Sequence, residues 1–107
     1  MSKTTRMGPI ELQTTVDPAR VGANTMHVYL FDAKTGAAYA KTKELTVKAA
    51  LPSKGIGGLA VTMHQAGPGH YVADAFQLVP GGTWHLTFTD RVSDFDEYTG
   101  TLKVPVS

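Results

Sequence analysis

Apolar and polar residues alternate with a period of two along most of the chain. In the segment Trp84-His85-Leu86-Thr87-Phe88, for example, every second residue is a large apolar one. Alternation over four to eight residues is typical of a strand with one face in a core and the other toward solvent. Seven runs of this kind occur, at residues 10–16, 28–31, 45–49, 59–64, 71–75, 84–89 and 101–106.

Glycine and proline separate these runs, as in Asp17-Pro18, Gly67-Pro68-Gly69 and Pro80-Gly81-Gly82. No stretch carries the persistent apolar stripe of an amphipathic helix. The sequence therefore predicts an all-β fold, an immunoglobulin-like antiparallel β-sandwich of about seven strands. We expect residues 1–8 to form a flexible lead-in and residues 9–107 to form a single β-sandwich domain.

The composition is that of a globular domain, with 42% hydrophobic and 18% charged residues among 107. A net charge of +1 lacks the strong positive excess of a nucleic-acid binder, so no nucleic-acid partner is expected. No apolar run approaches about 18 residues, so we expect no direct membrane insertion. Cysteine is absent, which excludes disulfides, thiol catalysis and cysteine-based zinc sites. We expect the isolated domain to be a monomer.

Motifs of enzymatic sites are missing from the chain. There is no Gly-x-Ser-x-Gly elbow, and the glycines of residues 55–58 are not followed by the Lys-Ser/Thr of a phosphate-binding loop. The acidic stretch at residues 90–97 lacks the glycine of an EF-hand loop, so we interpret it as a solvated hairpin connection. We therefore expect that the chain is not an enzyme.

Five segments in order carry a family resemblance: residues 17–24 (Asp-Pro-Ala-Arg-Val-Gly-Ala-Asn), 27–32 (His-Val-Tyr-Leu-Phe-Asp), 67–71 (Gly-Pro-Gly-His-Tyr), 81–86 (Gly-Gly-Thr-Trp-His-Leu) and 91–96 (Arg-Val-Ser-Asp-Phe-Asp). Together they resemble the extracytoplasmic C-terminal, YtkA-like domain of CopD/YcnJ-type bacterial copper transport and resistance proteins. The resemblance covers roughly residues 14–106.

This resemblance implies an immunoglobulin-like sandwich that belongs to a membrane protein and lies in the periplasm or at the cell surface. It also implies copper handling, either by binding copper or by docking a copper-handling partner. The expected partners are the transmembrane part of the parent protein or a copper chaperone.

Histidine is the obvious metal ligand in this sequence, because imidazole suits copper. If Met63 pairs with Tyr71, the core-facing residues of both strands align and His64 lies directly opposite His70. Cross-strand neighbours have Cβ atoms about 4.5–5.5 Å apart, which allows two imidazoles to share one ion. The spacing therefore predicts a metal site at His64 and His70, with copper as the possible cofactor. A pair of solvated surface histidines is the alternative.

The remaining candidate residues are expected to be structural. His27 and His85 are expected as lone surface residues. Met26 and Met63 each precede a histidine and are expected to pack in the core, because adjacent strand residues point to opposite faces. Trp84 shares its parity with Leu86 and Phe88 and is expected at the centre of the core.

Two other function classes remain open. A metal-free structural or protein-interaction module would use an exposed aromatic patch, for which Tyr29, Phe31 and Tyr98 are candidates. A carbohydrate-binding domain would need several exposed aromatic residues on one face, and strand parity places several of the aromatic residues inside.

Overall fold

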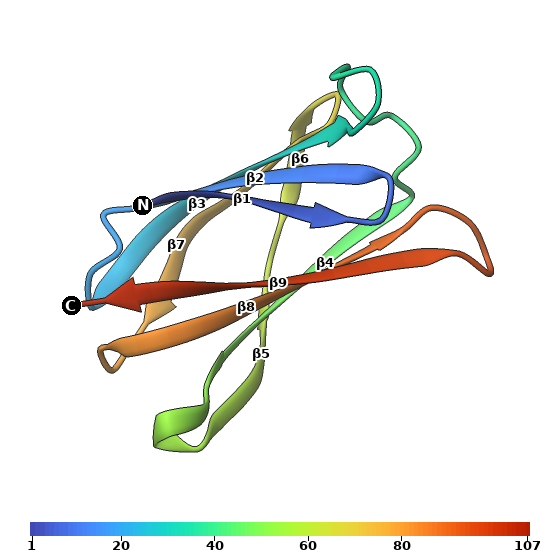
Figure 1. Cartoon of the computed structure of the whole chain (residues 1–107). Helices are drawn as coiled ribbons and strands as arrows, with labels where there is room; N and C mark the ends of the chain where they lie inside the picture. The colour runs from blue at the N-terminus through green and yellow to red at the C-terminus, as the bar shows by residue number, and fades with distance from the viewer.

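The computed structural model describes residues 1–107 and contains nine strands and one short 3₁₀ helix (Figure 1). The elements in chain order are β1 (Ser2–Met7), β2 (Ile10–Asp17), β3 (Gly22–Asp32), β4 (Glu44–Leu51), η1 (Pro52–Lys54), β5 (Ile56–Val61), β6 (His64–Gly67), β7 (His70–Leu78), β8 (Gly82–Arg91) and β9 (Glu97–Val106).

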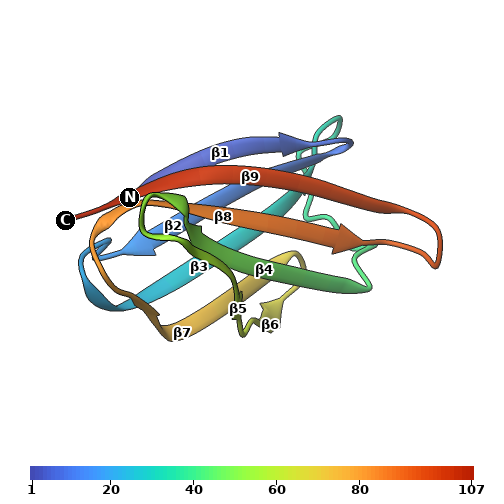
Figure 2. The same cartoon turned by 90° about the horizontal axis from the view of Figure 1, so that it is seen from below.

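Two antiparallel sheets pack face to face (Figures 1 and 2). One sheet has the order β1-β2-β3-β7-β6 and the other has the order β5-β4-β8-β9. Without β1 and β5, the series β2-β3-β7-β6 and β4-β8-β9 follow the ABED and CFG orders of an immunoglobulin-type sandwich. The predicted fold class is confirmed, with nine strands instead of about seven.

The alternation in sequence builds the core between the sheets. Trp84, Leu86 and Phe88 point inward from β8 and are completely buried. The indole Nε1 of Trp84 donates a hydrogen bond of 2.9 Å to the carbonyl of Pro80, so its one polar atom is satisfied. Met26 is completely buried, as its parity predicts, and Met63 is partly buried against the core.

The prediction of a flexible lead-in over residues 1–8 is wrong, because Ser2–Met7 form strand β1 along β2. Met7 is buried and covers Gly100 of β9, where an added Cβ would lie 2.5 Å from the Met7 side chain. The Lys3 ammonium donates to the carbonyl of Lys103 at 2.6 Å, and β1 lies beside β9 in Figure 2. An edge strand can be polar on both faces, so β1 carries no alternation to detect.

The predicted run at residues 59–64 is two strands in different sheets. β5 pairs with β4, the chain crosses between the sheets at residues 62–63, and β6 pairs with β7. The register of β6 is therefore independent of β5. His64 pairs with Val72 and Gln65 pairs with Tyr71, so Met63 is not the partner of Tyr71.

Gly69 fixes the β6–β7 hairpin against β3. Its φ is +65°, and an added Cβ would lie 2.7 Å from the carbonyl oxygen of Leu30. The carbonyl of Gly69 also accepts a hydrogen bond of 2.8 Å from the Leu30 N–H. The hairpin backbone therefore approaches β3 more closely than a side chain at position 69 would permit.

Gly69→Ala is expected to lower the free energy of unfolding by about 2–4 kcal/mol, because it adds a backbone clash to the strain of a positive φ. Gly36→Ala is the matched control, since Gly36 has a φ of +75° and nothing within 4 Å of an added Cβ. Urea unfolding of both variants measures the difference. Equal losses in the two variants would contradict the close approach at Gly69.

Candidate functional site

Two histidines meet on the outer face of the five-stranded sheet. Val28 and Tyr71 are register partners whose side chains point into the core, so His27 and His70 project from the opposite face. His27 Nδ1 lies 3.1 Å from His70 Nε2, and both side chains are half-buried. The structure therefore brings His70 to His27 instead of His64.

The register explains this contact. His27 pairs with Val72 and Tyr29 pairs with His70, so the two histidines are diagonal neighbours on β3 and β7. Diagonal neighbours lie within reach of long or aromatic side chains. The two imidazole rings have centroids 5.4 Å apart and planes inclined by 23°.

Tyr29 and Phe31 extend the two imidazoles into a row of four rings. The Tyr29 ring lies 4.2 Å from the His70 ring, centroid to centroid, at an interplanar angle of 9°, and Phe31 stacks on Tyr29 at 6.4 Å. We call Phe31, Tyr29, His70 and His27 the ring row. Tyr29 stacks on one face of His70, and the edge of the His70 ring that carries Nε2 points to His27 Nδ1.

The register predicted for His64 and His70 is wrong, because β6 pairs with β7 so that Gly67, and not His64, is the partner of His70. His64 is exposed on the edge strand, and its Nε2 lies 3.9 Å from Asp74 Oδ2. Val72 separates His64 from His27 across the sheet. Metal binding by His64 and His70 stays a prediction without the cross-strand geometry on which it depended.

His85 lies on the other sheet, opposite Lys103 of β9. No three His, Asp or Glu side chains gather closely enough to hold a metal ion among them. His27 and His70 form the closest pair of imidazoles.

A nitrogen–nitrogen distance of 3.1 Å suits two chemical states. In one state, one imidazole donates an N–H···N hydrogen bond to the other. In the other state, both nitrogens are adjacent ligands of one metal ion, since metal–nitrogen bonds of about 2.0–2.1 Å at angles of about 90–109° give a separation of about 2.9–3.3 Å. Replacing the shared proton by an ion therefore keeps this nitrogen–nitrogen distance but requires the rings to tilt, because both nitrogens now lie close to the line between the ring centroids.

Sequence reasoning placed His27 on the outer face but assigned it no partner. The strand order of the fold identifies the partner of His27. Strands B and E are neighbours in the ABED sheet of an immunoglobulin-type sandwich. These strands are β3 and β7 here. Combining that adjacency with strand parity brings His27 toward His70.

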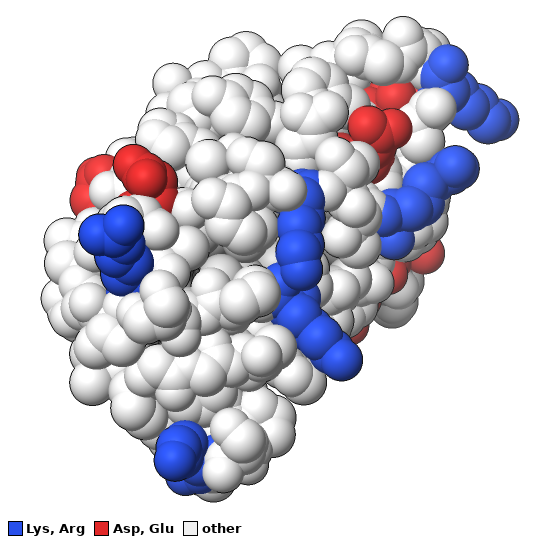
Figure 3. All heavy atoms as spheres, turned by 60° about the vertical axis from the view of Figure 1, so that its left-hand side comes forward, with Lys and Arg blue, Asp and Glu red and all other residues white.

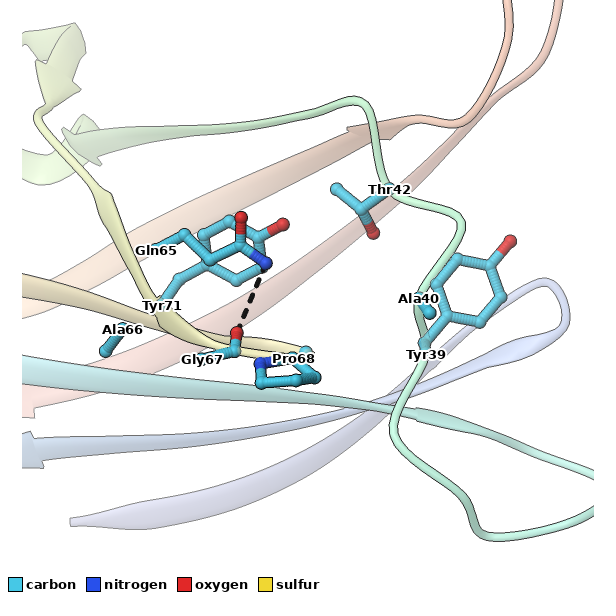
Figure 4. Close-up of a pocket in the computed structure, with 9 residues that line it drawn as sticks. Tyr39, Ala40, Thr42, Gln65, Ala66, Gly67, Pro68 and Tyr71 are labelled. Carbon is cyan, nitrogen blue, oxygen red and sulfur yellow. Dashed lines mark hydrogen bonds between the residues drawn. The ribbon is translucent and has the colours of Figure 1, made fainter.

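A pocket of about 490 Å³ opens at one end of the sandwich, between loop 33–43 and the β6–β7 hairpin (Figure 4). Gln65 and Tyr71 lie on one side and Tyr39 and Thr42 lie on the other (Figure 4). The Gln65 amide donates to the carbonyl of Gly67 at 3.2 Å. The lining residues are Tyr39, Ala40, Thr42, Gln65, Ala66, Gly67, Pro68, Gly69 and Tyr71, none of which carries a charged side chain.

A buried acid lies beside this pocket. Asp90 is 0% exposed, and its Oδ2 accepts a hydrogen bond of 2.8 Å from Thr42, whereas its Oδ1 has no partner. Burial raises the pKa of Asp90 to about 6, against the lowering effect of the Thr42 hydrogen bond. The pKa values of Tyr39 and Tyr71 are raised by burial and then by the Asp90 charge, which places the carboxylate within electrostatic range of both phenols.

The interpretation of residues 90–97 as a solvated connection is wrong for Asp90. β8 runs to Arg91, and Asp90 continues the inward series of Trp84, Leu86 and Phe88. The alternation of β8 predicts that Asp90 points inward. Its charge instead favoured placement in the solvated connection.

Charges on the face drawn in Figure 3 are scattered, with Lys and Arg side chains standing apart on a mainly uncharged surface. The single helix, η1, has three residues, and no helix of the structure has the length and apolar character needed to cross a membrane.

Searches against protein-family models, curated proteins and solved structures find no match for this chain.

Proposed function

We propose that this chain is a copper-handling β-sandwich domain that works outside the cytoplasm as an accessory part of a bacterial copper transport or resistance protein. The observation that supports it best is the 3.1 Å separation of His27 Nδ1 and His70 Nε2 on an open sheet face. The sequence resemblance supplies the identity of the metal and the extracytoplasmic location.

In this proposal copper is cargo, and the two imidazoles are its protein ligands. Tyr29 stacks on His70 and limits rotation of that ring, so less freedom is lost when the ion binds. Two ligands leave the remaining coordination positions to water or to groups of a partner. An incomplete site of this kind suits capture and transfer, because a donor or acceptor protein can reach the ion directly.

Copper titration of the domain tests the proposal. His27→Ala/His70→Ala is expected to weaken copper binding by more than about tenfold, since loss of ligands costs at least as much affinity as loss of their supporting contacts. Separate titrations with Cu(I) and Cu(II) are followed by competition with a chelating indicator.

His64→Ala and His85→Ala are the controls and are expected to retain wild-type affinity. A saturable site lost in His64→Ala but kept in the His27/His70 variant would contradict the assignment. No saturable binding in the wild type would contradict the copper function itself.

A metal-free interaction module is the second candidate, favoured by exposed aromatic side chains. Tyr29 is 38% exposed within the ring row, and Phe95 is 96% exposed in the β8–β9 loop. Aromatic residues are common anchors of protein interfaces. Under this candidate, Tyr29→Ser weakens binding of the transmembrane part or a copper chaperone, while copper has no saturable site.

A further inference from the structure

We propose that the pocket between loop 33–43 and the β6–β7 hairpin binds an organic cation, an alkylammonium or guanidinium group of the kind at the end of a lysine or arginine side chain, with Asp90 as its counter-charge. This site is separate from the ring row, which lies on the outer face of the sheet. It therefore does not depend on the proposed copper function.

The first support is a buried carboxylate that lacks a positive partner. Its one hydrogen bond, from Thr42, leaves Oδ1 unsatisfied in a fully buried position. Unpaired buried charge is costly, and most buried carboxylates are paired or fully hydrogen-bonded. A cation in the adjacent pocket would offset this cost.

The charged and titratable groups around Asp90 do not supply that partner. Its neighbours on the adjacent strands are Leu45 and Tyr98. The phenols of Tyr39 in loop 33–43 and Tyr71 in β7 lie within electrostatic range of it. Arg91 points to the other face of β8, where its guanidinium lies 3.4 Å from Glu44 and 3.9 Å from Asp94. The three lysines of the loop, Lys34, Lys41 and Lys43, are exposed.

The second support is the chemistry of the pocket wall. Thr42 belongs to both the wall and the Asp90 hydrogen bond, so it joins the carboxylate to the cavity. The wall has two phenol rings and an amide, and these offer ring faces and oxygen acceptors to a cation. It contains no Lys, Arg or His that would repel one.

A pH dependence follows from the same geometry. The ionised carboxylate behind Thr42 attracts a cation in the pocket, and Asp90 has a pKa of about 6 without ligand. Affinity is expected to be constant well above pH 6 and to fall about tenfold for each pH unit below it. Bound cation in turn is expected to lower the apparent pKa of Asp90.

The probes are n-butylammonium chloride and methylguanidinium chloride, with n-butanol as the neutral control at the same concentration. Binding is followed by NMR of the Asp90 carboxyl carbon and of the amides at residues 39–42 and 65–71. We expect saturable shifts with the cations and none with n-butanol. Absence of saturation with both cations at 50 mM (about tenfold above a weak fragment-like Kd near 5 mM, roughly −3 kcal/mol) would overturn the proposal.

Asp90→Asn is expected to reduce affinity at pH 8 at least tenfold, whereas Asp94→Asn, which removes an exposed carboxylate of the same chain, is expected to leave it unchanged. Equal binding by Asp90→Asn would overturn the role of the carboxylate. If that variant does not fold, the Asp90 carbon shift of the wild type is titrated against pH with and without n-butylammonium, and an unchanged pKa would overturn the proposal.

The peptide acetyl-Gly-Lys-Gly-amide separates the two sources of the cation. Tighter binding of the peptide than of n-butylammonium would support a lysine side chain of a partner protein as the occupant. Equal or weaker binding of the peptide, with saturable binding of the amine, would support a free organic amine.

Discussion

Asp90→Asn is expected to raise the free energy of unfolding by about 2 kcal/mol at pH 8. The pKa of Asp90 is about 6 in the folded chain, against 3.8 for an ordinary aspartate. The folded state therefore binds the proton more tightly than the unfolded state does. Wild-type stability is highest when Asp90 is protonated in both states, falls as pH rises through about 3.8–6, and stays low above that window. Asparagine stays neutral and its oxygen still accepts the Thr42 hydrogen bond.

Urea unfolding of the wild type and of Asp90→Asn at pH 4 and pH 8 measures this effect. The gain is expected at pH 8 and is expected to be small at pH 4, where the wild-type carboxyl is protonated. Asp94→Asn, at an exposed acid, is the control and is expected to change stability little at either pH. An effect of Asp90→Asn on the free energy of unfolding that is the same at pH 4 and pH 8 would contradict the cost of burying the ionised carboxylate.

Trp84→Ala is expected to cost about 3–5 kcal/mol, a large part of the total stability of a domain of this size. The indole is 0% exposed between the two sheets and its Nε1 is hydrogen-bonded to Pro80. Its removal leaves a cavity between the sheets and removes the hydrogen bond to Pro80. Trp84→Phe keeps most of the apolar volume and is expected to lose less.

Chemical denaturation of both Trp84 variants tests this, with circular dichroism as the readout because the single tryptophan is lost. Val79→Ala is the matched control, since Val79 is an exposed apolar residue close to Trp84 in sequence. A loss below about 1 kcal/mol in Trp84→Ala would place the indole outside the core.

The sandwich follows from sequence because alternation with a period of two reports which face of a strand is buried. β8 and β9 are the best cases, since each has three inward apolar residues in regular alternation: Trp84, Leu86 and Phe88 in β8, and Leu102, Val104 and Val106 in β9. β1 is not predictable in this way, because an edge strand with both faces near solvent needs no apolar series; Met7 is its one deeply buried residue.

The metal site was less predictable because it depends on register between strands. The crossing of the chain between sheets at residues 62–63 is a tertiary event with no local signal, and it moved His64 away from His70. His70 keeps its predicted outward position, but its partner is His27 from β3. The burial of Asp90, in contrast, is predictable from local sequence, because its place in the alternation of β8 points it inward.

Electron paramagnetic resonance of the domain with less than one equivalent of Cu(II) tests most directly whether His27 and His70 hold one copper ion. Pulsed spectra count the coordinated imidazoles. Two imidazoles are expected in the wild type and in His64→Ala, and one is expected in each of His27→Ala and His70→Ala. A wild-type spectrum with one imidazole, or a count of two that survives His27→Ala, would contradict the shared site.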